Sequence, residues 1–308
     1  MWDNLFYFTV NNPPTQNSWF KDYGSIIGNV ITILLFIIAF YKDKAKNRKK
    51  EEKTKTEKLK YLASLVNGSI KSAKLNKDNI QETSNAFKSE PALFHLIKIN
   101  TYYDIKRVVE KLNLEEYYLA YVTHFEKRKN TTIEFQKIIT CLDTLFDMFN
   151  EIIKQAERAS INDFDRKKVL NGLGDEVHNL IEKILHLVED SKMPQSFKSL
   201  LKQPIEKWSK EKNKTNIQLF FDILCVPLYN IVSDFHSQNQ LHTPLDFILL
   251  LERLKTIKIE FDFIKSGNII YSESLEMQIG EIDKTIGTLE INSKDLREYL
   301  EKSDSTSK

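Results

Sequence analysis

The chain is poor in the residues that make turns and cross-links. Its 308 residues include only 8 glycines, 7 prolines and 2 cysteines. Glycine and proline together usually make up about 12% of a protein, so their shortage disfavours an all-β sandwich and predicts long helices. Cys141 and Cys225 are too few for a disulfide framework or a four-thiolate zinc site. We therefore expect an all-α protein whose thiols are buried in a reducing compartment.

Recognisable catalytic motifs are also lacking. The glycines, at positions 24, 28, 68, 172, 174, 267, 280 and 287, form neither a Walker A loop nor a dinucleotide-binding fingerprint. There is no Gly-x-Ser-x-Gly elbow and no His-Glu-x-x-His pair. None of the arginines has a histidine four to six residues after it, the pattern of one class of helical ribonucleases. The sequence therefore predicts no enzyme class and no cofactor.

A long uncharged run lies near the N-terminus. Residues 23–41 contain no charged side chain and consist mainly of Ile, Leu, Val and Phe. A helix of this length spans about 30 Å, the thickness of the hydrocarbon core of a bilayer. A cleaved signal peptide would have basic residues before the apolar run and small residues after it, whereas here the basic residues follow. The run predicts one transmembrane helix over residues 24–41; a buried core helix is the alternative.

A cluster of basic residues follows the apolar run. The cations are Lys42, Lys44, Lys46, Arg48, Lys49 and Lys50, and Asp43 alone opposes them, so the cluster has a net charge of +5. Residues 1–23 have a net charge of −1. Since positive flanks stay in the cytoplasm, residues 1–23 should form a short extracytoplasmic N-terminus, and the remainder should lie inside the inner (plasma) membrane. Residues 42–60 are then a basic juxtamembrane stalk whose cations contact anionic lipid headgroups.

The remainder of the chain shows helical spacing of its apolar residues. Residues 61–270 predict a cytoplasmic antiparallel helical bundle, because runs with apolar steps of three and four alternate with short breaks. The longest expected helices cover residues 132–158, 163–190 (interrupted or bent near Gly172 and Gly174), 215–237 and 244–265. The net charge of residues 61–308 is −3, so we expect no nucleic-acid partner.

The C-terminal residues 271–308 carry a heptad pattern, followed by a tail that we expect to be disordered. The apolar positions alternate in steps of four and three, interrupted only by Ser293: Leu275, Ile279, Ile282, Ile286, Leu289, Leu296 and Leu300. This heptad seam suits a coiled coil with another chain, and packing on the chain's own bundle is the alternative. Gly24 and Gly28 add a Gly-x-x-x-Gly pair, which lets membrane helices approach closely. Both features predict a homo-oligomer or another protein partner.

One row of polar residues has the spacing of metal ligands. His178, Glu182 and His186 are four residues apart, and Asp175 precedes them by one turn. Imidazole and carboxylate groups suit Zn²⁺ or iron, which makes the row a candidate metal site. The alternative is a solvated polar flank, because the apolar residues of the same helix lie beside the row.

These observations favour a membrane-anchored cytoplasmic interaction protein: a scaffold, a sensor or a signalling partner. One alternative is a membrane-tethered effector of a bacterial antiphage or stress system. A second alternative is a metal-dependent enzyme that uses His178, Glu182 and His186. The abundance of Lys, Ile and Asn suggests an AT-rich bacterial genome.

Overall fold

The computed structural model describes the backbone of residues 18–190, 193–239 and 243–305, with the side chains of residues 18–31, 190 and 303–305 left out. All regular secondary structure in this described part is helical, so the prediction of an all-α fold is confirmed. The chain divides into two units, Met1–Lys58 and Leu59–Lys308, which we call the first and second unit.

The helices differ greatly in length. In chain order they are α1 (Ser18–Ser89), α2 (Tyr103–Lys111), α3 (Leu114–His124), α4 (Thr131–Asp190), α5 (Gln195–Ser209), α6 (Ile217–Phe220), the π-helical turn η1 (Phe221–Cys225), α7 (Val226–Gln238), α8 (Leu245–Asn292) and α9 (Lys294–Ser305). Residues 18–58 of helix α1 belong to the first unit, and residues 59–89 belong to the second unit.

In the first unit, the described side chains of α1 are open to solvent. Every side chain from Thr32 to Lys55 is exposed. These include a run of large apolar residues: Ile33, Leu34, Leu35, Phe36, Ile37, Ile38, Phe40 and Tyr41. The following polar stretch carries ion pairs one turn apart, for example Arg48 Nε to Glu52 Oε1 at 3.3 Å. Such pairs support a helix that has no packing face.

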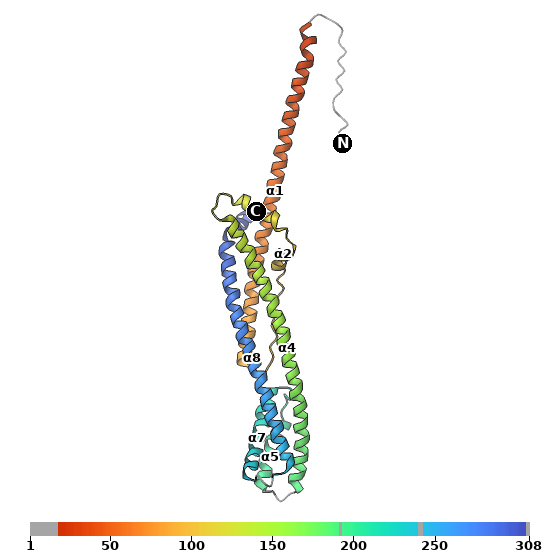
Figure 1. Cartoon of the computed structure of the whole chain (residues 1–308), viewed down its shortest axis with the longest axis vertical. Helices are drawn as coiled ribbons and strands as arrows, with labels where there is room; N and C mark the ends of the chain where they lie inside the picture. Colours follow the sequence, from red (N-terminus) through yellow and green to blue (C-terminus); the bar gives the residue numbers. More distant parts are fainter. Residues whose placement is uncertain (1–17, 191–192, 240–242, 306–308) are drawn as a thin grey trace. The chain divides into compact units, whose positions relative to one another are not determined.

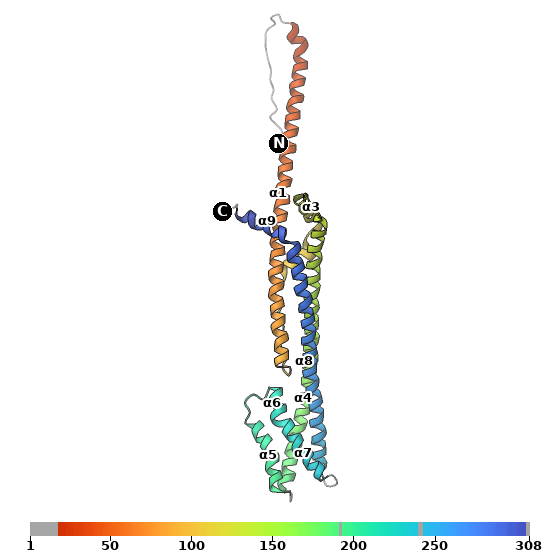
Figure 2. The ribbon, with the colours of Figure 1, turned by 90° about the vertical axis from the view of Figure 1, so that its left-hand side faces the viewer.

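The second unit is built on α4 and α8, which run side by side in opposite directions (Figures 1 and 2). Ion pairs between the two helices follow this antiparallel register: Arg166 pairs with Glu260, and Glu176, further along α4, pairs with Arg253, which comes earlier in α8. Around the N-terminal half of α4 and the C-terminal half of α8, helices α1, α2, α3 and α9 complete a first core that includes Phe87, Phe149 and Leu275. Around the C-terminal end of α4 and the N-terminal end of α8, α5, η1 and α7 complete a second core.

Both long helices pass through points where the sequence predicts a break. Helix α4 joins the two segments expected at 132–158 and 163–190 and continues through Gly172 and Gly174, and α8 runs from Leu245 to Asn292, past the expected end near residue 265. A glycine within a helix costs only about 1 kcal/mol relative to alanine, which packing against the partner helix offsets. The predicted interruption near Gly172 and Gly174 and the predicted helix end near residue 265 are therefore wrong; neither helix contains a proline at these points.

Candidate binding cavities along α4 and α8

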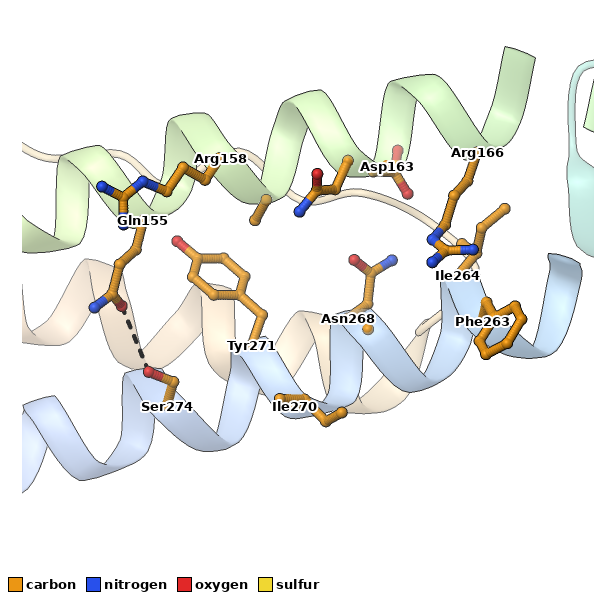
Figure 3. Close-up of a pocket in the computed structure, with 13 residues that line it drawn as sticks. Gln155, Arg158, Asp163, Arg166, Phe263, Ile264, Asn268, Ile270, Tyr271 and Ser274 are labelled. Carbon is orange, nitrogen blue, oxygen red and sulfur yellow. Dashed lines mark hydrogen bonds between the residues drawn. The ribbon is translucent and has the colours of Figure 1, made fainter. Parts of the chain in front are cut away.

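The apolar stripe of α4 is interrupted in the middle of the helix. Between Ile152, in the first core, and Leu170, beyond the gap, the sole buried residue of α4 is Asp163. We call residues 153–169 of α4 and 261–274 of α8 the waist, since neither main core extends along the whole of it. A cavity of about 290 Å³ lies here between the two helices (Figure 3). Ala159 and Gly267 line it and leave it space: a Cβ atom added to Gly267 would meet nothing within 4 Å.

Two buried polar groups at this cavity are not fully hydrogen-bonded. Asp163 is 8% exposed; its Oδ2 lies 2.6 Å from Lys167 Nζ, but its Oδ1 has no hydrogen-bond partner among the described residues. The hydroxyl of Tyr271, which points from α8 toward α4, is likewise buried and without a partner in the described part (Figure 3). Burial raises the pKa of Tyr271, so this hydroxyl stays neutral. Buried polar atoms of this kind are few in native proteins and point to a ligand, a water or a movable contact.

Polar contacts close the two ends of the cavity. At one end, Gln155 Oε1 accepts hydrogen bonds from Ser274 Oγ at 3.4 Å and Gln278 Nε2 at 2.8 Å. At the other end, Arg166 Nη1 lies 3.0 Å from Glu260 Oε2, and its guanidinium stands 4.7 Å from the centre of the Phe263 ring. These contacts hold α4 and α8 together where few apolar side chains do so, and the arrangement can accommodate a small polar molecule.

A second, larger cavity of about 540 Å³ lies between α4 and the α5–α6 region. Its wall includes Trp208 and Phe220, whose ring centres are 5.4 Å apart, and the lysines 167 and 214. Asp175 and His178 of the predicted metal row also line it. This cavity combines an aromatic surface with charged groups at its margin.

The predicted metal row lies along an exposed flank of α4. Asp175, His178, Glu182 and His186 are all exposed, and one contact joins members of the row, His178 Nε2 to Glu182 Oε1 at 3.4 Å. Within the described residues, no three His, Cys, Asp or Glu side chains come together as a metal ion would require. The geometry is that of a solvated flank beside the buried Val177, Ile181 and Ile184.

The heptad seam of α8 and α9 faces its own unit. Five of its members are buried in the first core (Leu275, Ile282, Ile286, Leu289 and Leu296), and two are partly buried against it (Ile279 and Leu300). Helix α1 lies along the same face, because Lys77 Nζ is 2.7 Å from Asp283 Oδ1 and the hydroxyls of Ser84 and Ser272 are 2.9 Å apart. The structure thus has the intramolecular arrangement, and association between chains stays a prediction.

The other predicted association and membrane residues belong to α1. Gly24 and Gly28 lie in the part of α1 whose side chains the structure does not describe, so the predicted helix contact at this pair falls outside the described residues. The basic residues at 42, 44, 46, 48, 49 and 50 are exposed. Their contact with anionic lipid headgroups stays a prediction.

Sequence reasoning missed both cavities. Asp163 and Tyr271 are 108 positions apart and belong to no motif, so only the pairing of α4 with α8 brings them to one place. One signal was available: the stripe of large apolar residues that includes Ile152 continues at steps of four, three and four with Ala156, Ala159 and then Asp163. A stretch of a long helix whose stripe has only small and charged residues indicates loose packing against the partner helix.

One helical segment of the described residues, Ile217–Gln238, is long and apolar enough to span a membrane. It comprises α6, η1 and α7, and Leu224, Cys225, Leu228 and Val232 from this segment are buried in the second core. A core helix of a folded domain has the same length and apolarity. Comparison of the chain with protein-family models, with curated proteins and with solved structures found no match.

Proposed function

We propose that this protein is a single-pass inner-membrane protein whose second unit acts in the cytoplasm by binding other molecules. The observation that carries the proposal is the exposed apolar run of α1, from Ile33 to Tyr41. A helix that is apolar on all sides is stable within a protein core or within lipid, and in the described residues no side chain covers this one. Ile33–Tyr41 is the second half of the charge-free stretch 23–41, and lipid is the cover that the length of this whole stretch suits.

The charges next to the run support the proposed orientation. Six exposed cations follow Tyr41 within nine residues, whereas residues 1–23 have a net charge of −1. This asymmetry favours a cytoplasmic location for the second unit, with the basic stalk close to anionic headgroups.

Within the interaction class, the waist favours a sensor over a rigid scaffold. A scaffold needs one stable arrangement, whereas a sensor needs an element with two arrangements of similar free energy. The waist has a cavity, buried polar atoms without a partner among the described residues, and polar contacts at both ends, and α4 contributes no buried apolar side chain to it between Ile152 and Leu170. Occupation of the cavity would change how α4 packs on α8, and the cores at both ends would transmit that change.

The proposed topology is tested by labelling single cysteines in intact cells. Cys141 and Cys225 are replaced by alanine, and one cysteine is introduced at Asn12 or at Ser199, which is exposed on α5. A membrane-impermeant maleimide should label the cysteine at position 12 in intact bacteria, and the one at position 199 only after lysis. Labelling of position 199 in intact cells would contradict the orientation, and recovery of the full-length chain in the soluble fraction after carbonate extraction would contradict the anchor.

Association between copies is part of this proposal and has a separate test. Two chains in one bilayer meet at a high effective concentration, so that a weak contact between membrane helices is sufficient for pairing. Crosslinking in native membranes should give a dimer whose yield falls in Gly28→Ile and stays unchanged in Gly280→Ile, since Gly280 of α8 is exposed and a Cβ atom added to it meets nothing within 4 Å. A monomer in both the parent and the variants would contradict association.

A further inference from the structure

The larger cavity, of about 540 Å³, has the size of a small-molecule site. Five of its lining residues are apolar or aromatic and come from four different helical elements: Leu170, Trp208, Ile217, Phe220 and Leu224. Trp208 and Phe220 meet edge to face, with a ring-centre distance of 5.4 Å and an angle of 63°. Together they give a flat ligand an aromatic surface to contact.

Polar groups converge on the same cavity from two directions. Lys167, Asn171, Asp175 and His178 follow one another at steps of four, four and three, so they lie on one face of α4. Lys214 and Thr215 reach the cavity from the segment between α5 and α6. The ammonium group of Lys167 is held in position by Asp163, at 2.6 Å from its Oδ2. The cavity is therefore amphipathic: aromatic on one part of its wall, and cationic, amide and carboxylate on the other.

The segment that carries Lys214 is strongly basic. Residues 207–216 contain four lysines and one glutamate, a net charge of +3, although the whole stretch from 61 to 308 is acidic. Within the described residues, Lys214 makes no ion pair. A basic segment at the mouth of an aromatic cavity attracts ligands that carry negative charge.

We propose that this cavity binds a mononucleotide. The base contacts Trp208 and Phe220, the phosphate lies toward Lys167 and Lys214, and the base edge is read by Asn171 and Asp175. Nucleobases stack on aromatic side chains and hydrogen-bond to amide and carboxylate groups, so one ligand satisfies all three parts of the wall. A fatty acid would match the apolar part and the lysines but would leave the amide and the carboxylate without partners. Inorganic phosphate would match the lysines alone.

The chain contains its own reporter for this site. Of its three tryptophans, Trp208 alone belongs to residues 59–308, because the other two are Trp2 and Trp19. In the full-length chain with Trp2→Phe and Trp19→Phe, in detergent or lipid nanodiscs, the tryptophan emission comes from the cavity. Titration with AMP, GMP, ATP and GTP should change this emission in a saturable way for at least one nucleotide. Equilibrium dialysis with the same four nucleotides provides a second readout that does not depend on fluorescence.

Three comparisons identify which parts of the ligand and of the wall matter. Adenosine or guanosine, which lack the charge-assisted contacts of the phosphate, and inorganic phosphate, which lacks the base that stacks on the aromatic wall, should each bind at least about tenfold more weakly than the matching nucleotide. Lys214→Ala should weaken binding about tenfold, whereas Lys212→Ala, in the same segment but outside the cavity wall, should change it by less than about twofold. Circular dichroism verifies that both variants keep the parent helix content.

Each remaining result counts against the site. Absence of saturable binding of all four nucleotides by both readouts overturns it. Equal affinity for the nucleoside and the nucleotide removes the role of the lysines. Equal losses in Lys214→Ala and Lys212→Ala would mean that the basic segment attracts anions without a defined cavity. None of these results bears on the membrane anchor, which the cysteine labelling tests independently.

Discussion

Two apolar helical segments of this protein look alike in composition and differ in what surrounds them. The segment Ile217–Gln238 presents Leu224, Cys225, Leu228 and Val232 to the second core, and each of them is at most 5% exposed. The run Ile33–Tyr41 of α1 has large apolar side chains that are between 42% and 73% exposed. The first is covered by its own chain, whereas the second has no cover in the described part of the molecule.

The difference shows why apolarity alone does not identify a membrane helix. In Ile217–Gln238 the buried positions fall on one side, and Asp222 and Asp234 interrupt the segment. In the α1 run, apolar side chains occupy all sides of the helix. A helix that is apolar on one side can bury that side against one neighbouring helix. A helix that is apolar on all sides must be surrounded by apolar groups, either of a protein core or of lipid.

The covered segment should respond most strongly to a charge. Leu228→Asp places a carboxylate at a fully buried position of α7 and should lower the free energy of unfolding by about 4 kcal/mol or more. Val226→Asp, on the same helix but 36% exposed, should cost less than about 1 kcal/mol. Urea unfolding followed by circular dichroism measures both. Similar losses in the two variants would mean that this segment is not covered by the second unit.

The uncovered run should respond in membrane insertion and not in folding. Leu34→Lys should make insertion of the proposed membrane helix less favourable by about 2.5–3.5 kcal/mol, the cost of a cation near the middle of such a helix. Carbonate extraction should then release more of the chain from membranes, while Leu34→Val behaves as the parent. The unfolding transition of the second unit should not shift. An unchanged membrane fraction in Leu34→Lys would remove the distinction between the two segments.

The heptad seam extends the comparison to a helix that sequence alone left undecided. Ile286→Val, at a position 2% exposed in the first core, should lower the free energy of unfolding by about 0.5–1.5 kcal/mol. Ile291→Val, at a position 77% exposed on the same helix, should stay within about 0.5 kcal/mol of the parent. The loss should not depend on protein concentration, because the seam packs within the chain. A loss that diminishes as concentration rises would instead indicate pairing between chains.

The comparison of covered and uncovered groups can also be made for the hydroxyl groups of two tyrosines. Tyr271→Phe removes a hydroxyl that has no partner among the described residues, so stability should stay level or rise by up to about 1 kcal/mol. Tyr102→Phe removes a hydroxyl that donates to Asn150 Oδ1 at 2.8 Å and should cost about 1 kcal/mol. Thermal unfolding of the two variants in parallel measures the contrast. A clear loss in Tyr271→Phe would show that the waist satisfies this hydroxyl.

Much of the helical content could be read from spacing, and the cavities could not. The spacing of Leu142, Leu145 and Phe149 predicts a helix with one face in the core, because apolar residues at steps of three and four lie on the same side of a helix. The continuity of α4 through Gly172 could not be predicted, since the small cost of a glycine is decided by the partner helix. The same holds for the larger cavity, whose Lys167 and Lys214 are separated by all of α5.

The sequence by itself determined the all-α class, the position of the charge-free apolar run and the basic cluster that follows it, because composition and period are local properties. The tertiary structure alone decided which apolar surfaces are covered. It placed the heptad seam of α8 in the first core and the segment Ile217–Gln238 in the second, and it brought Asp163 to Tyr271 at the waist. Burial depends on residues that are distant along the chain, so no pattern within one helix can tell a face that its own chain covers from one that lipid or another molecule must cover.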